Sequence, residues 1–131
     1  MRTSVLRAVG VATTAYGVAV TVRPGLLAKP SGLAGPDGRT AAEVRTSLRP
    51  LGLREAACGL ALALAPRGAA LRTAAAVRLA ADFGDAVLLG ATLPGPARRG
   101  GAVAVSVGWG ALTLAGLLLP ESPNARRAAA R

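Results

Sequence analysis

The sequence predicts an all-α protein, folded as a bundle of four transmembrane helices. Four apolar segments are separated by charged stretches or by proline and glycine, and the longest approach the roughly 20 residues that a helix needs to cross a bilayer. Apolar residues make up 52% of the chain, and they lack the period-two alternation of half-buried strands. We therefore expect one membrane domain over residues 1–120, followed by a basic tail over residues 121–131.

The first and fourth segments are the most apolar. We expect helices at about residues 4–22 and 101–119, and the fourth segment contains no charged residue before Pro120. A signal peptide is the alternative for the first segment, because Arg2 and Arg7 precede its apolar stretch. No A-x-A cleavage site follows this stretch, and three further apolar segments come after it. Both observations favour a retained membrane helix.

The second and third segments are interrupted by charged residues. We expect helices at about residues 51–65 and 70–93, each followed by a proline, Pro66 and Pro94. Proline lacks a backbone N–H and commonly follows the end of a helix. These boundaries complete four segments of helical length.

A shorter helix is expected between the first and second segments. Thr40 and Glu43 have the spacing of a capping box, in which the two side chains satisfy free N–H groups at a helix N-terminus. Ala41, Val44 and Leu48 would share one face of that helix. A short helix lying at the membrane interface fits this pattern, and an ordinary helical loop fits it equally.

The third segment contains three charged residues on one helical stripe. Arg78, Asp82 and Asp85 stand at positions i, i+4 and i+7, so a helix places them on the same face. At the bilayer centre they would cost about 3 kcal/mol each, whereas each large apolar residue returns only about 0.5 kcal/mol. The stripe must therefore face protein or water and not lipid.

The second segment offers the partners. It begins with Gly-Leu-Arg-Glu, in which Arg54 can reach an aspartate of the third segment and Glu55 can meet Arg78. The expected intramembrane charge network, or possible ligand or proton site, consists of Arg54, Glu55, Arg78, Asp82 and Asp85.

This network has three acids and two bases. One acid must then stay protonated or pair with a further cation, for which Arg7 and Arg72 are available, and Asp82 and Asp85 are the pair expected to share a proton. Two interpretations remain open. The network is either an ion-pair lattice that fixes the register of two helices, or a relay or polar ligand pocket built on the two aspartates.

Small residues and aromatics add weaker patterns. Small side chains repeat every four residues in three of the segments, which allows close approach of helices in lipid: Thr13, Gly17 and Thr21; Gly59 and Ala63; and Ala102, Ser106 and Gly110. The three aromatic residues, Tyr16, Phe83 and Trp109, fall near the middle of their segments. They either line a pocket with Asp82 or serve as interior packing.

Several classes of activity lack their residues. Histidine is absent and Cys58 is the single cysteine, so Cys/His zinc sites and Ser-His triads are excluded. Phosphate-binding glycine motifs and the G-x-S-x-G motif do not occur. The net charge of +10 is spread over the segment ends without clustered aromatics, which fits anionic lipid head groups better than nucleic acid. We expect no enzyme activity, no metal, no cofactor and no nucleic-acid partner.

Two motifs carry a resemblance to known proteins. Gly52-Leu-Arg54-Glu55 followed by Arg78-Leu-x-x-Asp82-x-x-Asp85 resembles the pattern of small four-helix membrane proteins, common in actinobacteria, that carry a "domain of unknown function" label. A similar unit stands ahead of the soluble domain in some bacterial cyclase/dehydrase-like proteins. The resemblance covers about residues 4–119 and implies a multi-pass protein of the bacterial plasma membrane with no assigned activity.

The function expected first is a structural or interaction role in the membrane, with the lipid bilayer, a second copy or another membrane protein as partner. The alternative is a small transporter or proton-coupled carrier that uses Asp82 and Asp85. An accessory subunit of a membrane redox enzyme and a peripheral helical bundle are further hypotheses. Basic residues are equally numerous at the two ends of the bundle, so the positive-inside rule leaves the orientation open, and only the basic C-terminal tail favours cytoplasmic termini.

Overall fold

The computed structural model describes residues 1–120, and in this range it is built from helices and loops without any strand. The predicted all-α class is therefore confirmed. The helices are listed here in chain order: α1 (Thr3–Val22), α2 (Gly25–Ala28), α3 (Ala42–Leu64), α4 (Ala69–Thr92) and α5 (Pro96–Leu118). The predicted basic tail, residues 121–131, lies outside the described residues.

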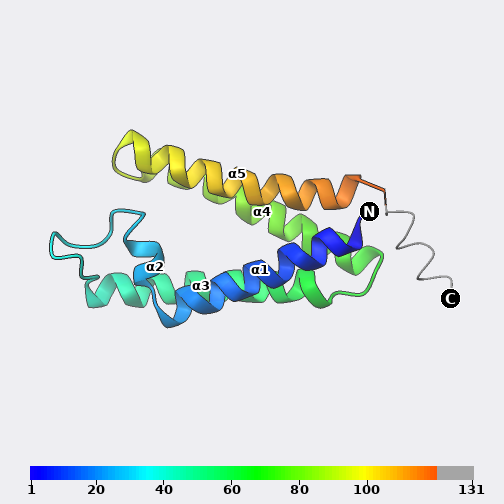
Figure 1. Ribbon diagram of the computed structural model, residues 1–131, viewed down its shortest axis with the longest axis horizontal. Helices are drawn as coiled ribbons and strands as arrows, with labels where there is room; N and C mark the ends of the chain where they lie inside the picture. Colours follow the sequence, from blue (N-terminus) through cyan, green and yellow to red (C-terminus); the bar gives the residue numbers. More distant parts are fainter. Residues whose placement is uncertain (121–131) are drawn as a thin grey trace.

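The four long helices form two antiparallel pairs. α1 packs along α3 and α4 packs along α5, whereas contacts between the two pairs are few. In Figure 1 the pairs lie one above the other, close together at the end that holds the N-terminus and further apart at the end that holds α2. The chain thus runs along the bundle four times, once in each long helix.

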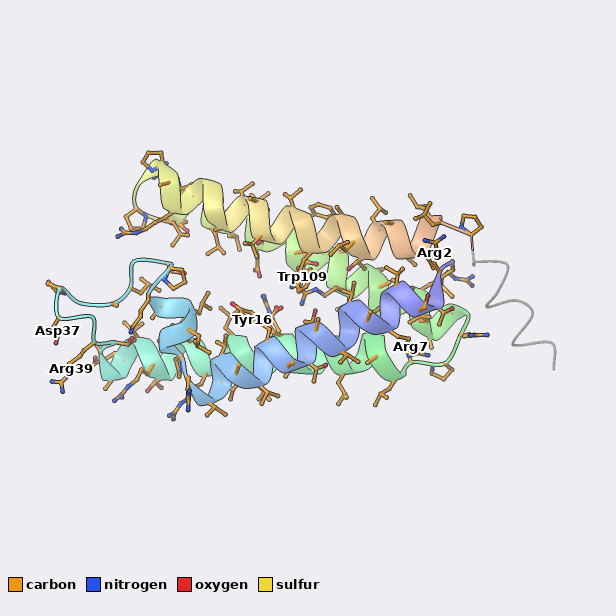
Figure 2. All side chains as sticks on the ribbon, in the orientation of Figure 1. Arg2, Arg7, Tyr16, Asp37, Arg39 and Trp109 are labelled. Atoms are coloured by element: carbon orange, nitrogen blue, oxygen red, sulfur yellow. The ribbon has the colours of Figure 1, made fainter. Side chains whose placement is uncertain are left out.

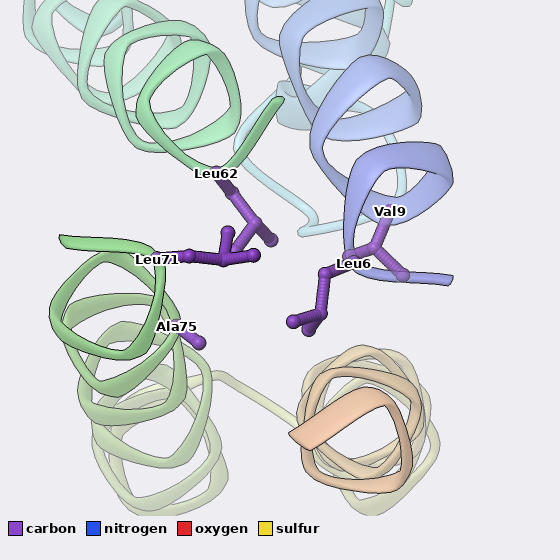
Figure 3. Packing of buried hydrophobic residues seen from close by; sticks show 5 residues of the cluster. All are labelled: Leu6, Val9, Leu62, Leu71 and Ala75. Atoms are coloured by element: carbon purple, nitrogen blue, oxygen red, sulfur yellow. The ribbon is translucent and has the colours of Figure 1, made fainter. Parts of the chain in front are cut away.

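The two pairs are joined at the end near the N-terminus. The backbone N–H of Arg2 donates to the carbonyl of Gly116 on α5 at 2.6 Å. A small apolar core closes this end, shown in Figure 3, and its buried members come from α1, α3 and α4: Leu6, Val9, Leu62, Leu71 and Ala75. No comparable apolar cluster is found at the α2 end of the described chain.

Glycines allow α1 and α3 to approach closely. Gly10 faces Gly59, and Gly17 faces Gly52, so that a β-carbon on Gly10 would lie 2.6 Å from the backbone nitrogen of Ala63. Gly10 and Gly17 are seven residues apart on α1, and Gly52 and Gly59 are seven residues apart on α3. This spacing keeps the two glycines of each helix on one face. The repeat of small residues in the sequence included Gly17 and Gly59 but not Gly10 and Gly52.

Helix α3 differs from its prediction. The expected interfacial helix and the second segment form one helix, Ala42–Leu64, that continues through Pro50. Proline removes a single hydrogen bond to the residue four positions earlier, and packing of the flanking Leu48 and Gly52, both buried, supports the helix across it. The predicted capping box is wrong, because Ala41 occupies the N-cap position and no side chain caps the helix.

Two other boundaries were missed. Helix α5 begins at Pro96, five residues before the expected start, because proline suits the first turn of a helix and Gly95 supplies a left-handed turn with φ of 82°. The four-residue α2 was not predicted. Helices α1 and α4 lie within one residue of their expected ends.

Length and apolarity single out α1 and α5 as helices that could cross a membrane. Both expose much of their surface in the described chain, and α5 buries the least. Helices α3 and α4 are not among these candidate spans, and each of them contains several charged residues. Of the predicted four-transmembrane bundle, the all-helical class is thus confirmed, and two helices of the described residues are candidate spans.

Candidate functional site

Helix α4 presents a charged stripe to the interior of the bundle. Ala75, Arg78 and Asp82 are all buried, as their spacing along one face of a helix requires. Arg78 is the largest fully enclosed side chain of the described residues and is 2% exposed. A guanidinium this deeply buried must be paired with carboxylates to be tolerated.

Arg78 binds two carboxylates, one on each of two helices. Its Nε donates to Oδ2 of Asp82 at 3.0 Å, and its Nη2 donates to Oδ1 of the same residue. Its Nη1 donates to Oε2 of Glu55 on α3 at 2.5 Å. Arg78 is therefore held in a fork by Asp82 on its own helix and ties α4 to α3 through Glu55.

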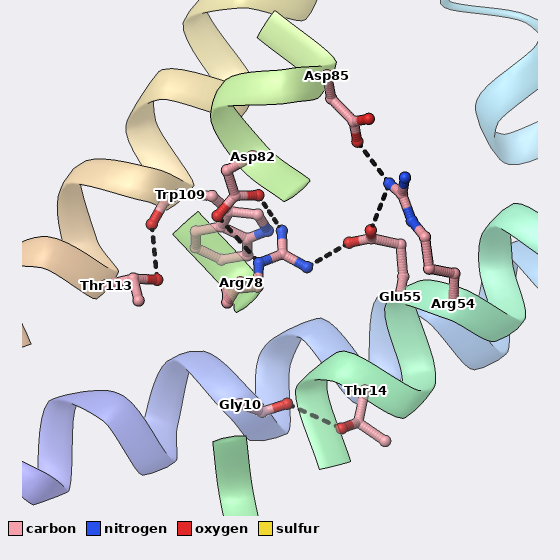
Figure 4. A network of polar contacts seen from close by, with 9 residues as sticks. All are labelled: Gly10, Thr14, Arg54, Glu55, Arg78, Asp82, Asp85, Trp109 and Thr113. Atoms are coloured by element: carbon pink, nitrogen blue, oxygen red, sulfur yellow. Dashed lines mark hydrogen bonds and ion pairs between the residues drawn. The ribbon is translucent and has the colours of Figure 1, made fainter. Parts of the chain in front are cut away.

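Arg54 extends the same network. Its Nη2 donates to Oε1 of Glu55 at 3.0 Å and to Oδ2 of Asp85 at 2.6 Å. The five residues form one chain of alternating sign, drawn in Figure 4, in the order Asp82, Arg78, Glu55, Arg54 and Asp85. We call these five residues the charge cluster.

The charge cluster runs from a buried end to an exposed end. The side chains of Asp82 and Arg78 are almost enclosed, whereas 28% of the Asp85 side chain and 41% of the Arg54 side chain are exposed. Oδ1 of Asp85 and the Nε and Nη1 atoms of Arg54 have no hydrogen-bond partner among the described residues. Only the exposed end can therefore engage another molecule without breaking an existing ion pair.

The charge cluster lies on the wall of a cleft of about 660 Å³ between the two helix pairs. Apolar side chains supply most of the remaining wall, and all five helices of residues 1–120 contribute to it. The larger ones are Val20, Leu26, Leu27, Leu51, Leu89, Leu93 and Val105. Wide apolar pockets with a few convergent polar groups are the usual form of a small-molecule site. The cleft occupies the region where the two pairs diverge toward the α2 end.

Two of the three aromatic residues line this cleft. Tyr16 on α1 and Trp109 on α5 stand in its wall together with Asp82, and Figure 2 shows both in the middle part of the molecule. Phe83 instead packs on α5, where a β-carbon on Gly110 would lie 3.0 Å from the tip of its ring. The pocket interpretation thus fits Tyr16 and Trp109, whereas Phe83 is 41% exposed and does not serve as interior packing.

The structure brings together all five residues of the expected network, but two details of the pairing differ. Asp82 and Asp85 do not share a hydrogen bond, because each faces a different arginine. Arg7 does not supply the further cation either. It donates to the backbone carbonyls of Leu62, Ala63 and Ala65, where it satisfies carbonyls at the C-terminal end of α3. Arg72 is exposed on α4 and makes no ion pair with the described residues.

The sequence pattern missed the residues at the rim of the cleft. Leu26 and Leu27 belong to the unpredicted α2, and Arg98 belongs to the early part of α5 that was expected to be a loop. The side chain of Arg98 lies against Gly32 in the segment after α2. The placement of these residues depends on how the helix ends meet, for which the sequence has no periodic signal.

Other reactive groups do not add to the site. Within residues 1–120, no group of three His, Cys, Asp or Glu side chains lies close enough to hold a metal ion. Cys58 is a free, partly buried residue of α3 outside the wall of the cleft.

Comparison of the chain with protein-family models, with curated proteins and with solved structures gives no match. The geometry of the charge cluster and of its cleft is therefore the basis for the function proposed below.

Proposed function

We propose that the chain is an integral membrane protein with a structural or interaction role, in which all four long helices cross the bilayer around the charge cluster. The observation that carries this proposal is the double pairing of Arg78 with Glu55 and Asp82. An arginine at the bilayer centre costs about 3 kcal/mol when it faces lipid. The same residue is tolerated when it faces the bundle interior and is paired.

Pairing supports membrane placement of the two charged helices. Taken alone, α3 and α4 carry too many charges to insert as well as α1 and α5 do. Side by side, they direct Glu55, Arg78 and Asp82 toward each other and leave apolar side chains such as Leu60 and Val87 exposed. An exposed apolar surface of this kind fits contact with lipid.

The proposed role of the charge cluster is to fix the register of α3 against α4. A displacement of one helix by a turn would separate Glu55 from Arg78 and leave both charges unpaired. Buried polar groups are well attested as devices that select one helix register. Basic residues at the helix ends would meet anionic head groups of a bacterial plasma membrane, and the exposed faces of α1 and α5 would contact lipid, a second copy or another membrane protein.

Membrane integration is tested by alkaline carbonate extraction of cell membranes. An integral protein stays in the pellet, whereas release into the supernatant would support the peripheral bundle and overturn the proposal. Reporter fusions at both ends of the chain give the orientation of the termini, which must lie on the same side if four helices cross.

The register role is tested by exchanging charges. Arg78→Glu alone should reduce the amount of folded protein, since it places a third acid beside Glu55 and Asp82. Adding Glu55→Arg restores an opposite charge across the α3–α4 contact and should recover part of the loss. An equal loss in the single and double variants would contradict a register-fixing contact.

A second candidate function is a small carrier that uses Asp82 and Asp85, and the cleft is the observation that favours it. Both aspartates line its wall, and Asp85 is partly exposed. A carrier predicts that Asp85→Asn keeps wild-type abundance but loses transport that depends on a proton gradient in reconstituted vesicles. A purely structural cluster predicts that neither the wild-type protein nor Asp85→Asn shows such transport.

A further inference from the structure

The charge cluster lacks one positive charge. Glu55, Asp82 and Asp85 face only Arg54 and Arg78, so the ionised cluster has a net charge of −1. Arg7 is used by backbone carbonyls. The other cation in the wall of the cleft, Arg98, belongs to its rim and makes no ion pair with the described residues. No ion pair of the described residues supplies the missing charge, which leaves room for a proton or a bound cation.

The negative excess is accessible at one atom. Oδ2 of Asp85 accepts from Arg54, whereas Oδ1 has no partner among the described residues and belongs to the partly exposed end of the cluster. Figure 4 shows this second oxygen turned away from the Arg54 guanidinium. A ligand cation can approach it without displacing an arginine.

The surroundings of Asp85 suit a cation with an apolar body. Tyr16 and Trp109 line the same cleft, and aromatic faces attract organic cations. The remaining wall is mainly apolar, with Ser31 and Ser106 as its further polar side chains, and it favours burial of a large apolar surface.

We propose that the cleft binds an amphipathic organic cation, with its positive charge beside Asp85 and its apolar body against Tyr16, Trp109 and the aliphatic wall. The inference rests on the proposed function, because an unbalanced charge is costly only if the cluster lies within the membrane. It also assigns a substrate class to the carrier that stands as the second candidate function.

An anionic amphiphile is the competing occupant. Arg98 on the rim would attract it, but deeper in the cleft it would meet three carboxylates against two guanidinium groups. Its binding would increase the negative excess, whereas binding of a cation removes the excess. The whole wall contains three arginines and three acids once Arg98 is counted, so it is the charge balance of the five-residue cluster that favours the cation.

The test uses two probes of the same shape and opposite charge, tetraphenylphosphonium and tetraphenylborate. The full chain is purified in a mild nonionic detergent, and binding is followed by the fluorescence of Trp109, the single tryptophan of the chain, which lies in the cleft wall. We expect saturable quenching by the phosphonium ion and at least tenfold weaker binding of the borate ion. Equal binding of both ions, or tighter binding of borate, would overturn the proposal.

Two pairs of variants locate the bound cation. Asp85→Asn should weaken phosphonium binding at least tenfold, whereas Asp37→Asn, in an exposed loop outside the cleft, should leave it unchanged. Ala102→Phe adds a ring in the cleft wall and should also weaken binding, whereas Ala104→Phe, on the exposed face of the same helix, should not. Wild-type affinity in Ala102→Phe would place the cation elsewhere and refute the site.

The outcomes separate this inference from the proposed function. If Asp85→Asn does not fold, the comparison of Ala102→Phe with Ala104→Phe decides the question, because these two substitutions leave every charge in place. A chain that resists carbonate extraction but does not bind phosphonium would refute the cation site alone. A chain that carbonate releases would refute the membrane placement, whatever it binds.

Discussion

Gly17 on α1 and Gly52 on α3 face each other so closely that a β-carbon on Gly17 would collide with the backbone of Ala56. Gly10 and Gly59 repeat this relationship two turns away. Four glycines therefore set the distance between α1 and α3, and through it the position of Glu55, which lies between Gly52 and Gly59 on the same helix.

The first prediction concerns this contact. Gly17→Ala should lower the stability of the bundle by about 1–3 kcal/mol, the usual cost of overfilling a packed interior, because only backbone atoms of α3 lie in the way. Thermal unfolding in detergent, followed by circular dichroism, measures the change.

A matched glycine provides the control. Gly84 lies within α4 with no atom near the position of a β-carbon, so Gly84→Ala should stabilise the helix by up to about 1 kcal/mol. If both variants shifted the unfolding temperature in the same direction, the close α1–α3 contact would not explain the effect of Gly17→Ala.

The second prediction concerns the residue shared by two arginines. Glu55→Gln should destabilise the bundle by about 3–5 kcal/mol, the range seen when one partner of a buried ion pair is removed, because Arg78 keeps only Asp82 and Arg54 keeps only Asp85. Glu43→Gln, at an exposed position of the same helix, serves as the control. A double-mutant cycle with Arg78→Gln should give a coupling energy well above zero, and additive effects would argue against a direct interaction.

The third prediction separates the two aspartates. Asp82→Asn removes one end of a buried fork on Arg78 and should cost several kcal/mol. Asp85→Asn removes a partly exposed pair with Arg54, for which about 1 kcal/mol or less is expected. Chemical unfolding of the two variants in the same detergent gives the comparison, and equal losses would contradict the gradient of burial along the charge cluster.

The sequence predicted the charge cluster better than it predicted the cleft. Residues 78, 82 and 85 share a face of any helix, so their common direction follows from helix geometry alone, and the scarcity of acids left few possible partners. The divergence of the two helix pairs has no such local signal. It depends on tertiary contacts of single residues, such as Leu6 against Gly116 at the closed end and Arg98 against Gly32 at the rim.

Helix boundaries also divide into those with a local sequence signal and those that depend on tertiary contacts. Proline predicts the helix ends before Pro66 and Pro94 correctly, whereas Pro50 lies inside α3 and Pro96 begins α5. Proline suits a first turn, as at Pro96, and it is tolerated within a helix when packing supports both sides, as at Pro50. The choice between these outcomes depends on neighbours in space, which a single sequence does not display.

The last prediction concerns a polar group without a partner. Thr13 on α1 is fully buried, and its hydroxyl makes no hydrogen bond within the described residues. Its neighbour Thr14 donates from Oγ1 to the carbonyl of Gly10 at 2.8 Å. Replacing an unsatisfied buried hydroxyl with a methyl group of similar shape removes a penalty of about 1–3 kcal/mol, so Thr13→Val should raise the unfolding temperature. Thr14→Val loses a made hydrogen bond and should lower it or leave it unchanged. If Thr13→Val lowered the unfolding temperature more than Thr14→Val, the Thr13 hydroxyl would have to bind a group outside residues 1–120, such as a water molecule or a second chain.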